Sequence, residues 1–342
     1  MEDGLRRLAG AAAAVVDLAD EPVVPASRKL RLAALALELG LDWESPGARL
    51  RPQALERVPF EGPKLAVIGT GKRTGKTAIA QHWARLLRDR GRDPVIVCMG
   101  RGGPAQPQIG EPGLGLDELA RLAESGEHAA SDYLEDAVLA GVRTVGCRRV
   151  GGGLTGEPAD SNLREGALLA VSLQPDVLLF EGSGACIPQV EVDRTVCVTG
   201  AGPSEPFDEL RLARADLVLI ANGAAREAPR DRLAIRFELR PEPVGEVDQS
   251  ARVACFTTGA PPPEGVQSVV ASRALARRAE LQADLDHAAA ERCDLYMTEL
   301  KAAAIDTVAA RARREGAQVL LLRNRPIGLD RDLDAELVKL AR

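Results

Sequence analysis

Aromatic residues, long apolar runs and cysteine pairs are all scarce in this chain. Phe, Trp and Tyr make up 3% of the 342 residues, so a core must come mainly from Ala, Leu and Val. No apolar run reaches the roughly 20 residues that a membrane-spanning helix needs. The short apolar stretch 11–16 is flanked by charged residues on both sides and is more typical of an amphipathic helix than of a signal peptide. We therefore expect no membrane partner.

The six cysteines are scattered without a Cys-x-x-Cys pair, and the three histidines lie far apart in the sequence. This pattern favours neither a zinc site nor a disulfide framework and is typical of the reducing cytoplasm, where we place the protein. The 50 acidic residues outnumber the 44 basic ones, giving a net charge of −6. An acidic chain of this kind is not expected to bind nucleic acids generally. The hydrophobic content of 45% is ample for one large or two medium domains.

The most informative segment is KLAVIGTGKRTGKTAIA, residues 64–80. A short apolar run precedes a glycine-rich loop that ends in Gly-Lys-Thr, and a helical pattern follows. Strand, loop and helix in this order are the context of a phosphate-binding loop (P-loop). Lys76 is then expected to reach the β- and γ-phosphates, and Thr77 to hold Mg²⁺. The expected nucleotide contacts are Gly69, Thr70, Gly71, Thr74, Gly75, Lys76, Thr77 and Ala78.

The spacing of this loop is irregular. The common motif places its first glycine five residues before the glycine of Gly-Lys-Thr. Here that position is Thr70, with Gly69 and Gly71 on either side. A chance strand-turn-helix junction is the alternative interpretation, but the flanking strand and helix patterns favour nucleotide binding.

From residue 64 onward, apolar strand-like runs alternate with helical patterns, which predicts an α/β fold with a mostly parallel sheet and helices on both faces. The expected strands are 64–68, 94–98, 143–147, 176–180, 194–198, 215–221, 232–239, 252–257, 293–298 and 317–323. The expected helices are 76–90, 115–124, 131–140, 162–173, 206–213, 271–290, 301–315 and 331–341. We take 61–342 as the P-loop NTPase domain, with a C-terminal subregion starting near residue 260.

Residues 1–60 are rich in Ala, Leu and Arg and lack strand-like runs. We predict a short helical N-terminal region there, with helices near 3–18, 27–40 and 52–57.

In parallel sheets, ligands bind at the carboxyl ends of the strands. Glu181 follows a buried strand and precedes Gly182, where a carboxylate can hold Mg²⁺ or orient a group at the γ-phosphate. An acidic strand cap is the alternative. Arg101, Arg148 and Arg149 follow two other strands beside glycines, and their guanidinium groups match the oxygens of an anionic substrate. Exposed loop arginines are the alternative.

Six weaker candidates complete the set. His128 and Asp132 lie before or at the start of a predicted helix, where Asp132 or Asp136 can assist a metal or substrate, or simply offset the helix dipole. Lys301 opens another predicted helix, where its positive charge is unfavourable unless an anion binds or the side chain extends into solvent. Asn222 and Asn324 each follow an apolar strand, where an amide can contact a purine edge or form a turn.

Taken together, the blocks GTGKRTGKT, VCMGRGGP, HAASDYLEDA, GCRR-x-GGG, LLFEGSGA and ELKAAAID, in this order, resemble the cyclic 2,3-diphosphoglycerate synthetase family. The similarity spans about residues 64–325. The family is related to dethiobiotin synthetase-like P-loop proteins, in which the first glycine also stands six residues before the glycine of Gly-Lys-Thr. The spacing from Gly69 to Gly75 agrees with that pattern.

The resemblance implies an ATP- and Mg²⁺-dependent ligase that closes an intramolecular phosphoanhydride in 2,3-bisphosphoglycerate. It also implies a homodimer. Two adjacent phosphates need dense neutralisation, which Lys72, Arg73 and Lys301 can supply beside Lys76 and the three arginines named above. We assign catalytic roles to Lys72, Arg73, Lys76 and Glu181, and metal binding to Thr77 and Glu181.

The family carries a larger region before its loop, whereas about 60 residues precede the loop here. Two alternatives therefore remain open at this point. One is a kinase or ligase acting on another small phosphorylated acid. The other is an ATP-switched regulatory P-loop module.

Overall fold

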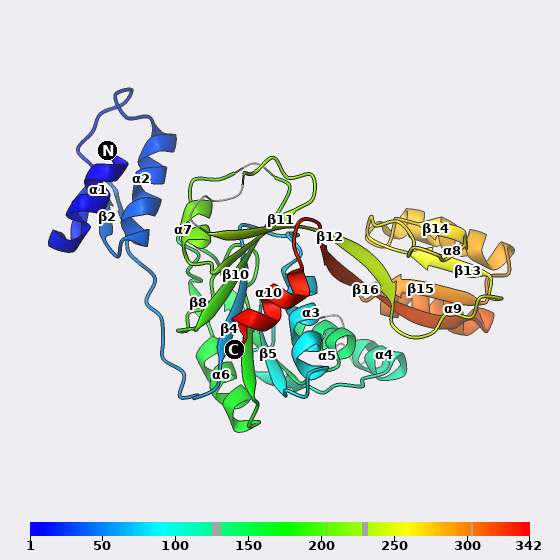
Figure 1. Ribbon diagram of the computed structural model, residues 1–342. Helices are drawn as coiled ribbons and strands as arrows, with labels where there is room; N and C mark the ends of the chain where they lie inside the picture. The colour runs from blue at the N-terminus through cyan, green and yellow to red at the C-terminus, as the bar shows by residue number, and fades with distance from the viewer. Residues whose placement is uncertain (125–130, 203, 228–231, 302–303) are drawn as a thin grey trace.

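In the computed structural model, which describes all residues except 125–130, 203, 228–231 and 302–303, a central sheet stands between two smaller modules (Figure 1). The N-terminal module comprises residues 1–50. The C-terminal module comprises residues 244–322. An extended linker joins the N-terminal module to the first strand of the central sheet, and two long strands join the central sheet to the C-terminal module.

The central sheet is built from apolar segments that are buried on both faces, as expected for parallel strands covered by helices. Its strands are β4 (Lys64–Gly69), β5 (Pro94–Gly100), β6 (Gln108–Gly110), β7 (Thr144–Val150), β8 (Asp160–Ser161), β9 (Val177–Glu181), β10 (Arg194–Thr199), β11 (Leu217–Ala221) and β12 (Leu233–Pro243). They lie in the order β12-β11-β10-β4-β9-β5-β7-β6, and β8 pairs with β7. All pairs are parallel except those of β6 and β8 with β7. This confirms the predicted mostly parallel α/β sheet.

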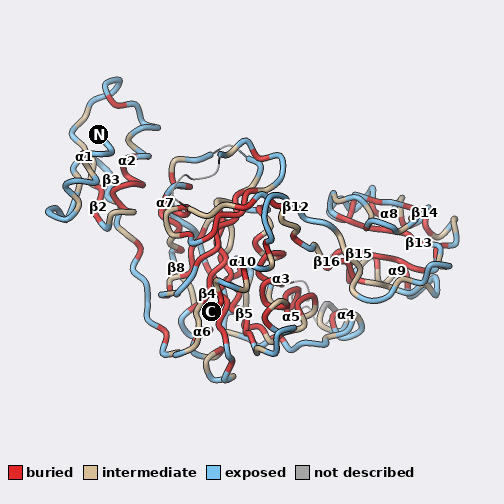
Figure 2. Tube along the Cα trace, viewed as in Figure 1, coloured by how far each residue is buried: buried red, intermediate tan, exposed pale blue. Residues whose placement is uncertain are grey.

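Helices cover both faces of this sheet. On one face lie α3 (Lys76–Arg88), α5 (Asp132–Ala140) and α10 (Leu333–Leu340), which bury Trp83 and Leu337 against the strands. On the other face lie α6 (Leu163–Ser172) and α7 (Asp208–Ala213), which bury Ala167 and Leu212. The buried residues run as red segments through the centre of Figure 2. Strand β4 is therefore covered by helices on both faces, and this holds the start of the loop that follows it in place.

The C-terminal module has a parallel sheet of its own. Its strands are β13 (Val253–Phe256), β14 (Ser268–Ser272), β15 (Leu295–Glu299) and the first part of β16 (Gln318–Gly328), in the order β14-β13-β15-β16. Its core packs under α8 (Arg278–Ala290) and α9 (Ala310–Glu315), with a π-helical segment, Ala304–Ala309, before α9. A further helix, α4 (Leu116–Glu124), extends from the central part toward that π-helical segment.

The pairing of β12 with β16 determines where the carboxyl ends of the two parallel sheets lie. These two strands are antiparallel, and their pairing runs from Phe237 opposite Gly328 to Pro243 opposite Leu322. Because β11 pairs only with the first half of β12 and β15 only with the first half of β16, the two parallel sheets point toward each other. Their carboxyl ends therefore meet across one cleft.

The prediction of an all-helical N-terminal region is wrong in part. The helices α1 (Glu2–Leu8) and α2 (Ala26–Glu38) are present, but a small sheet of β1 (Ala14–Val16), β2 (Asp42–Ser45) and β3 (Ala48–Leu50) lies beside them. Residues 52–57 are extended linker, in which Glu56 bridges to Val190. The module packs its apolar side on Phe207 and Leu210 next to α7. That tertiary contact stabilises strands too short to stand out in the sequence.

Three other expectations also differ from the structure. The helix expected over 271–290 begins at Arg278, because 268–272 form the edge strand β14. Strands β7 and β16 are longer than expected, so Arg148 and Arg149 lie within β7 and Asn324 lies within β16. None of the described helices is long and apolar enough to cross a bilayer.

Candidate functional site

The loop between β4 and α3 has the geometry of a phosphate cradle. Gly75 adopts φ 100°, a left-handed conformation that favours glycine, immediately before the helix begins at Lys76. A Cβ atom at Gly69 would lie 2.8 Å from Oγ1 of Thr74 and 2.9 Å from the carbonyl oxygen of Val198. Gly69 is therefore the position where the loop packs most tightly on the neighbouring strand. The helix N-terminus below the loop provides the partial positive charge that anions favour.

Lys76 is 7% exposed and lies inside this loop. Its Nζ donates to the carbonyl oxygen of Gly71 at 2.7 Å. Burial lowers the pKa of the Lys76 ammonium group, and the nearby Glu181 carboxylate opposes that shift. A phosphate oxygen can take the place of the Gly71 carbonyl as the acceptor. Lys72 and Arg73, at the loop tip, are exposed, and Arg73 adopts φ 58°.

Thr77 and Glu181, the two predicted metal ligands, are brought together. The Thr77 hydroxyl donates to Oε1 of Glu181 at 2.6 Å. They meet because β9 lies next to β4, with Glu181 opposite Val67. Burial raises the pKa of Glu181 to about 7, and the negative charge of Asp132 adds to that shift. An oxygen pair of this kind, one hydroxyl and one carboxylate beside a phosphate loop, fits the hard oxygen ligands that Mg²⁺ prefers.

A second group of buried polar residues supports Glu181. Asp136 is fully buried and accepts hydrogen bonds from Nε2 of Gln81 at 2.9 Å and from the Cys98 thiol at 2.6 Å. The Cys98 sulfur lies 3.7 Å from Oε2 of Glu181. Burial raises the pKa of Asp136, and the charge of Glu181 adds to it. The sequence offered Asp132 and Asp136 equally. Their position along α5 distinguishes them: Asp132 begins the helix and is exposed, whereas Asp136 lies one turn further in and is buried.

The C-terminal module forms the opposite wall. A cavity of about 250 Å³ extends from the P-loop to the carboxyl end of β15, where it is lined by Glu299, Lys301 and Asn324. Glu299 is buried and accepts hydrogen bonds from the backbone N–H and hydroxyl of Thr258, at 2.9 and 2.6 Å. Nδ2 of Asn324 reaches Oε1 of Glu299 at 3.3 Å. The amide of Asn324 therefore lines the nucleotide side of the cleft from the middle of a strand. Sequence reasoning missed Glu299, which ends its strand as Glu181 does.

Lys301 makes an ion pair that the sequence did not indicate. Its Nζ donates to both carboxylate oxygens of Glu135 on α5, at 2.9 and 2.7 Å. The position of Lys301 suggested an anionic ligand or solvent beside it; the structure shows a carboxylate of the protein there, and substrate binding by Lys301 stays a prediction. Burial raises the pKa of the Glu135 carboxyl group, and the charge of Lys301 opposes that shift. The pair also ties the C-terminal module to α5 beside the P-loop.

The predicted residues Arg101, Arg148, Arg149 and Asn222 are not among those that line this cavity. Arg149 is buried, whereas Arg101 and Arg148 are exposed. Asn222 follows β11 as expected but donates to Oε2 of Glu238 at 3.3 Å, away from the cavity described above. His128 lies outside the described residues.

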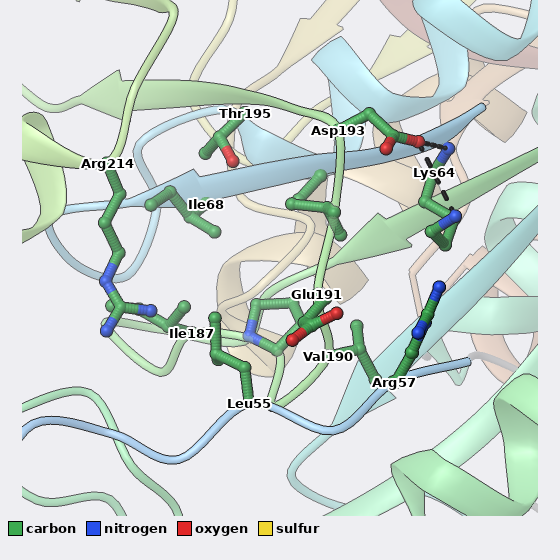
Figure 3. Close-up of a pocket in the computed structure, with 13 residues that line it drawn as sticks. Leu55, Arg57, Lys64, Ile68, Ile187, Val190, Glu191, Asp193, Thr195 and Arg214 are labelled. Carbon is green, nitrogen blue, oxygen red and sulfur yellow. Dashed lines mark hydrogen bonds and ion pairs between the residues drawn. The ribbon is translucent and has the colours of Figure 1, made fainter.

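A larger cavity of about 550 Å³ lies elsewhere on β4 and β10 (Figure 3). The linker residue Leu55 and the segment around Ile187 and Val190 enclose it, and Lys64 and Asp193 pair at one end. Lys64 begins β4, so this cavity reaches the amino end of the strand rather than the P-loop. It lacks the glycine-rich loops that surround the P-loop site.

Comparison with known protein families agrees with these features. Residues 64–240 match the family model described as cyclic 2,3-diphosphoglycerate synthetase, P-loop domain. Residues 263–325 match the model of the C-terminal domain of the same synthetase.

Curated relatives carry the same name. A cyclic 2,3-diphosphoglycerate synthetase of Rubrobacter xylanophilus is 43% identical over 96% of this chain and 81% of that protein. Relatives from Thermococcus onnurineus and Pyrococcus furiosus are 36% and 37% identical, each over 96% of this chain and 82% of theirs. A crystal structure of LpxK from Aquifex aeolicus in complex with ATP covers 84% of this chain and 90% of that one, with a TM-score of 0.48 and 16% identity. That likeness is too distant to bear on the activity.

Proposed function

The chain belongs to the cyclic 2,3-diphosphoglycerate synthetase family, and we propose from this that it closes the cyclic phosphoanhydride of 2,3-bisphosphoglycerate with ATP. The single observation that carries the proposal is the 43% identity to a named synthetase over 96% of the chain. The P-loop domain and the pairing of Thr77 with Glu181 are consistent with an ATP-dependent ligase.

Two in-line transfers account for the products. An oxygen of one substrate phosphate attacks the γ-phosphorus of ATP, and ADP leaves. An oxygen of the second substrate phosphate then attacks the phosphorus of the first, and the transferred group leaves as inorganic phosphate. The bond formed is the intramolecular anhydride, and atoms and charges balance. This chemistry needs positioning and charge stabilisation rather than a protein nucleophile.

The residues of the cleft can supply both the positioning and the charge stabilisation. Lys76 would hold the β- and γ-phosphates from within the loop, and Lys72 and Arg73 would neutralise charge at the loop tip. Thr77 and Glu181 would hold Mg²⁺, which neutralises phosphate charge when bound. Asp136, fixed by Gln81 and Cys98, keeps the Glu181 carboxyl group in place.

Placement of the substrate between the two facing sheets would also limit access of water. Leu239 and Leu300 line the cavity beside Lys76. A phosphorylated intermediate must be protected from hydrolysis until the ring closes. From the family resemblance we further propose that the protein acts as a cytoplasmic homodimer.

Phosphorus NMR tests the proposal directly. The protein with ATP, Mg²⁺ and 2,3-bisphosphoglycerate should produce the resonances of a cyclic pyrophosphate, together with ADP and inorganic phosphate. Lys76→Ala should abolish them while the thermal unfolding curve stays cooperative. Lys339→Ala, at an exposed lysine far along the chain, is the matched control and should retain activity. ATP consumption with another phosphorylated acid, and no cyclic product, would contradict the proposal.

A further inference from the structure

Arg149 is a buried arginine that has no ion pair among the described residues. It is 6% exposed, and its Nη1 group donates to the carbonyl oxygen of Gly151. Its Nε atom is buried without a hydrogen-bond partner among the described residues. A buried, unpaired donor on a charged group is strongly unfavourable, and native proteins rarely leave one.

Two other arginines with little exposure have fuller sets of partners. Arg211 donates to three carbonyl oxygens, on Ala185, Phe207 and Leu154. Arg226 pairs with the carboxylate of Asp208. Arg149 has neither arrangement in the part of the chain that the structure describes. The contrast indicates that its partner is not a protein group.

Glycines pack closely around the guanidinium group, at positions where any side chain would crowd it. A Cβ atom at Gly184 would lie 3.3 Å from Nη2 of Arg149 and 3.6 Å from Cγ of Lys72. One at Gly152 would lie 3.4 Å from Nη1. Gly184 belongs to the loop that follows Glu181, and Lys72 belongs to the P-loop. A cationic side chain from β7 and one from the P-loop thus approach the same glycine, next to the nucleotide site.

The orientation of the guanidinium group selects the shape of the ligand. Nη1 is used by Gly151, which leaves the edge formed by Nε and Nη2. Two parallel N–H groups on that edge match two oxygens of one phosphate or carboxylate. We propose that this edge of Arg149, with Lys72, binds a phosphate group of the three-carbon acceptor.

This subsite rests on the proposed function and makes it more specific. It places the acceptor at the Gly184 side of the P-loop, next to Glu181. Lys301 is paired with Glu135, and its role in this arrangement is to link the C-terminal module to α5. Arg194 provides a matched control, because it begins β10 at the amino edge of the sheet, opposite to the P-loop, and its side chain is exposed.

Calorimetric titration of 2,3-bisphosphoglycerate into the full chain, with Mg²⁺ and a non-hydrolysable ATP analogue, tests the subsite without turnover. Arg149→Ala should weaken binding of the acceptor roughly 100-fold, because two charge-assisted hydrogen bonds are lost. Arg149→Lys should recover only part of the affinity, because an ammonium group cannot bind in the same two-point way. Arg194→Ala should change it less than about threefold.

Two further measurements distinguish ligand binding from a structural role. Affinity for the ATP analogue should stay within about threefold in Arg149→Ala, and added guanidinium ion should partly restore acceptor binding. The loss should persist with propane-1,2-diyl bisphosphate, which keeps both phosphates and lacks the carboxylate. If Arg149→Ala bound that analogue as tightly as the wild type does, the assignment of Arg149 to a phosphate group would be overturned. Equal loss of affinity for nucleotide and acceptor would overturn the subsite.

Failure of this inference can be told apart from failure of the proposed function. Cyclic product formed by Arg149→Ala at wild-type rates and acceptor concentrations would reject the subsite alone. Binding of phosphorylated acids by the wild-type protein that depends on Arg149, without any cyclic product, would support the subsite and reject cyclisation.

Discussion

Replacement of Glu181 by Gln should change how the stability of the metal-free protein depends on pH. Glu181 is buried beside Asp136, and its carboxyl group titrates near pH 7 rather than near 4.5. Between these two values the folded protein holds a proton that the unfolded chain has released. The unfolding free energy of the wild type should therefore fall as pH rises through this window.

The magnitude follows from the size of the pKa change. A rise from 4.5 to about 7, at about 1.4 kcal/mol for each pH unit, corresponds to a loss of about 3 kcal/mol between pH 4.5 and 7. Glutamine resembles the protonated acid and carries no charge at any pH. The Glu181→Gln variant should therefore lack this component, so that the difference between wild type and variant changes by about 3 kcal/mol across the window.

Urea unfolding in EDTA at intervals from pH 5 to 8 measures this difference. Glu61→Gln removes an exposed carboxyl group and controls for the loss of one titratable side chain. Addition of Mg²⁺ with ATP should stabilise the wild type more at pH 8 than at pH 5, because the ligand binds the ionised carboxylate. Parallel curves for wild type and Glu181→Gln would refute the reasoning.

Three other predictions concern the loop and the module contact. Lys76→Ala should lower ATP turnover at least 100-fold, as expected when a donor to the transferring phosphate is removed, with turnover measured by coupled ADP release. Gly69→Ala should lower the unfolding free energy by about 1–3 kcal/mol, because the new Cβ cannot fit beside Thr74, and nucleotide-free urea unfolding checks this. Lys301→Ala should cost about 1–3 kcal/mol by leaving Glu135 unpaired. The double variant Lys301→Ala, Glu135→Ala should be less destabilised than the sum of the single ones, and simple additivity in that cycle would argue against the ion pair.

Much of the central fold could be predicted from the sequence because buried parallel strands are continuous apolar runs that glycines and prolines interrupt. Strand β4 and helix α3 lie almost where the pattern placed them. The short strands of the N-terminal module could not be found in this way. Segments of three or four residues carry no detectable period, and the contact with Phe207 and Leu210 that holds the module is distant in the chain.

The candidate site shows the same division. Thr77 was predictable because it completes the Gly-Lys-Thr that opens the helix after the loop, and Glu181 because it ends a strand before Gly182. Arg149 is buried and Arg148 exposed because successive residues of a strand point to opposite faces. Asp132 and Asp136 share one face of α5, but Asp132 begins the helix and is exposed, whereas Asp136 lies one turn further in and is buried.

The sequence alone determined the energy source, since the loop from Gly69 to Thr77 needs only local backbone geometry to form a phosphate cradle. It also determined the parallel sheet, since the apolar strands and the helices between them alternate in order. The tertiary structure decided what faces that loop. The antiparallel pairing of β12 with β16 turns the carboxyl ends of the two parallel sheets toward each other. Glu299 and Lys301 therefore line the same cavity as Lys76. This arrangement of the two carboxyl ends depends on the order and direction of the strands, which only the folded chain determines.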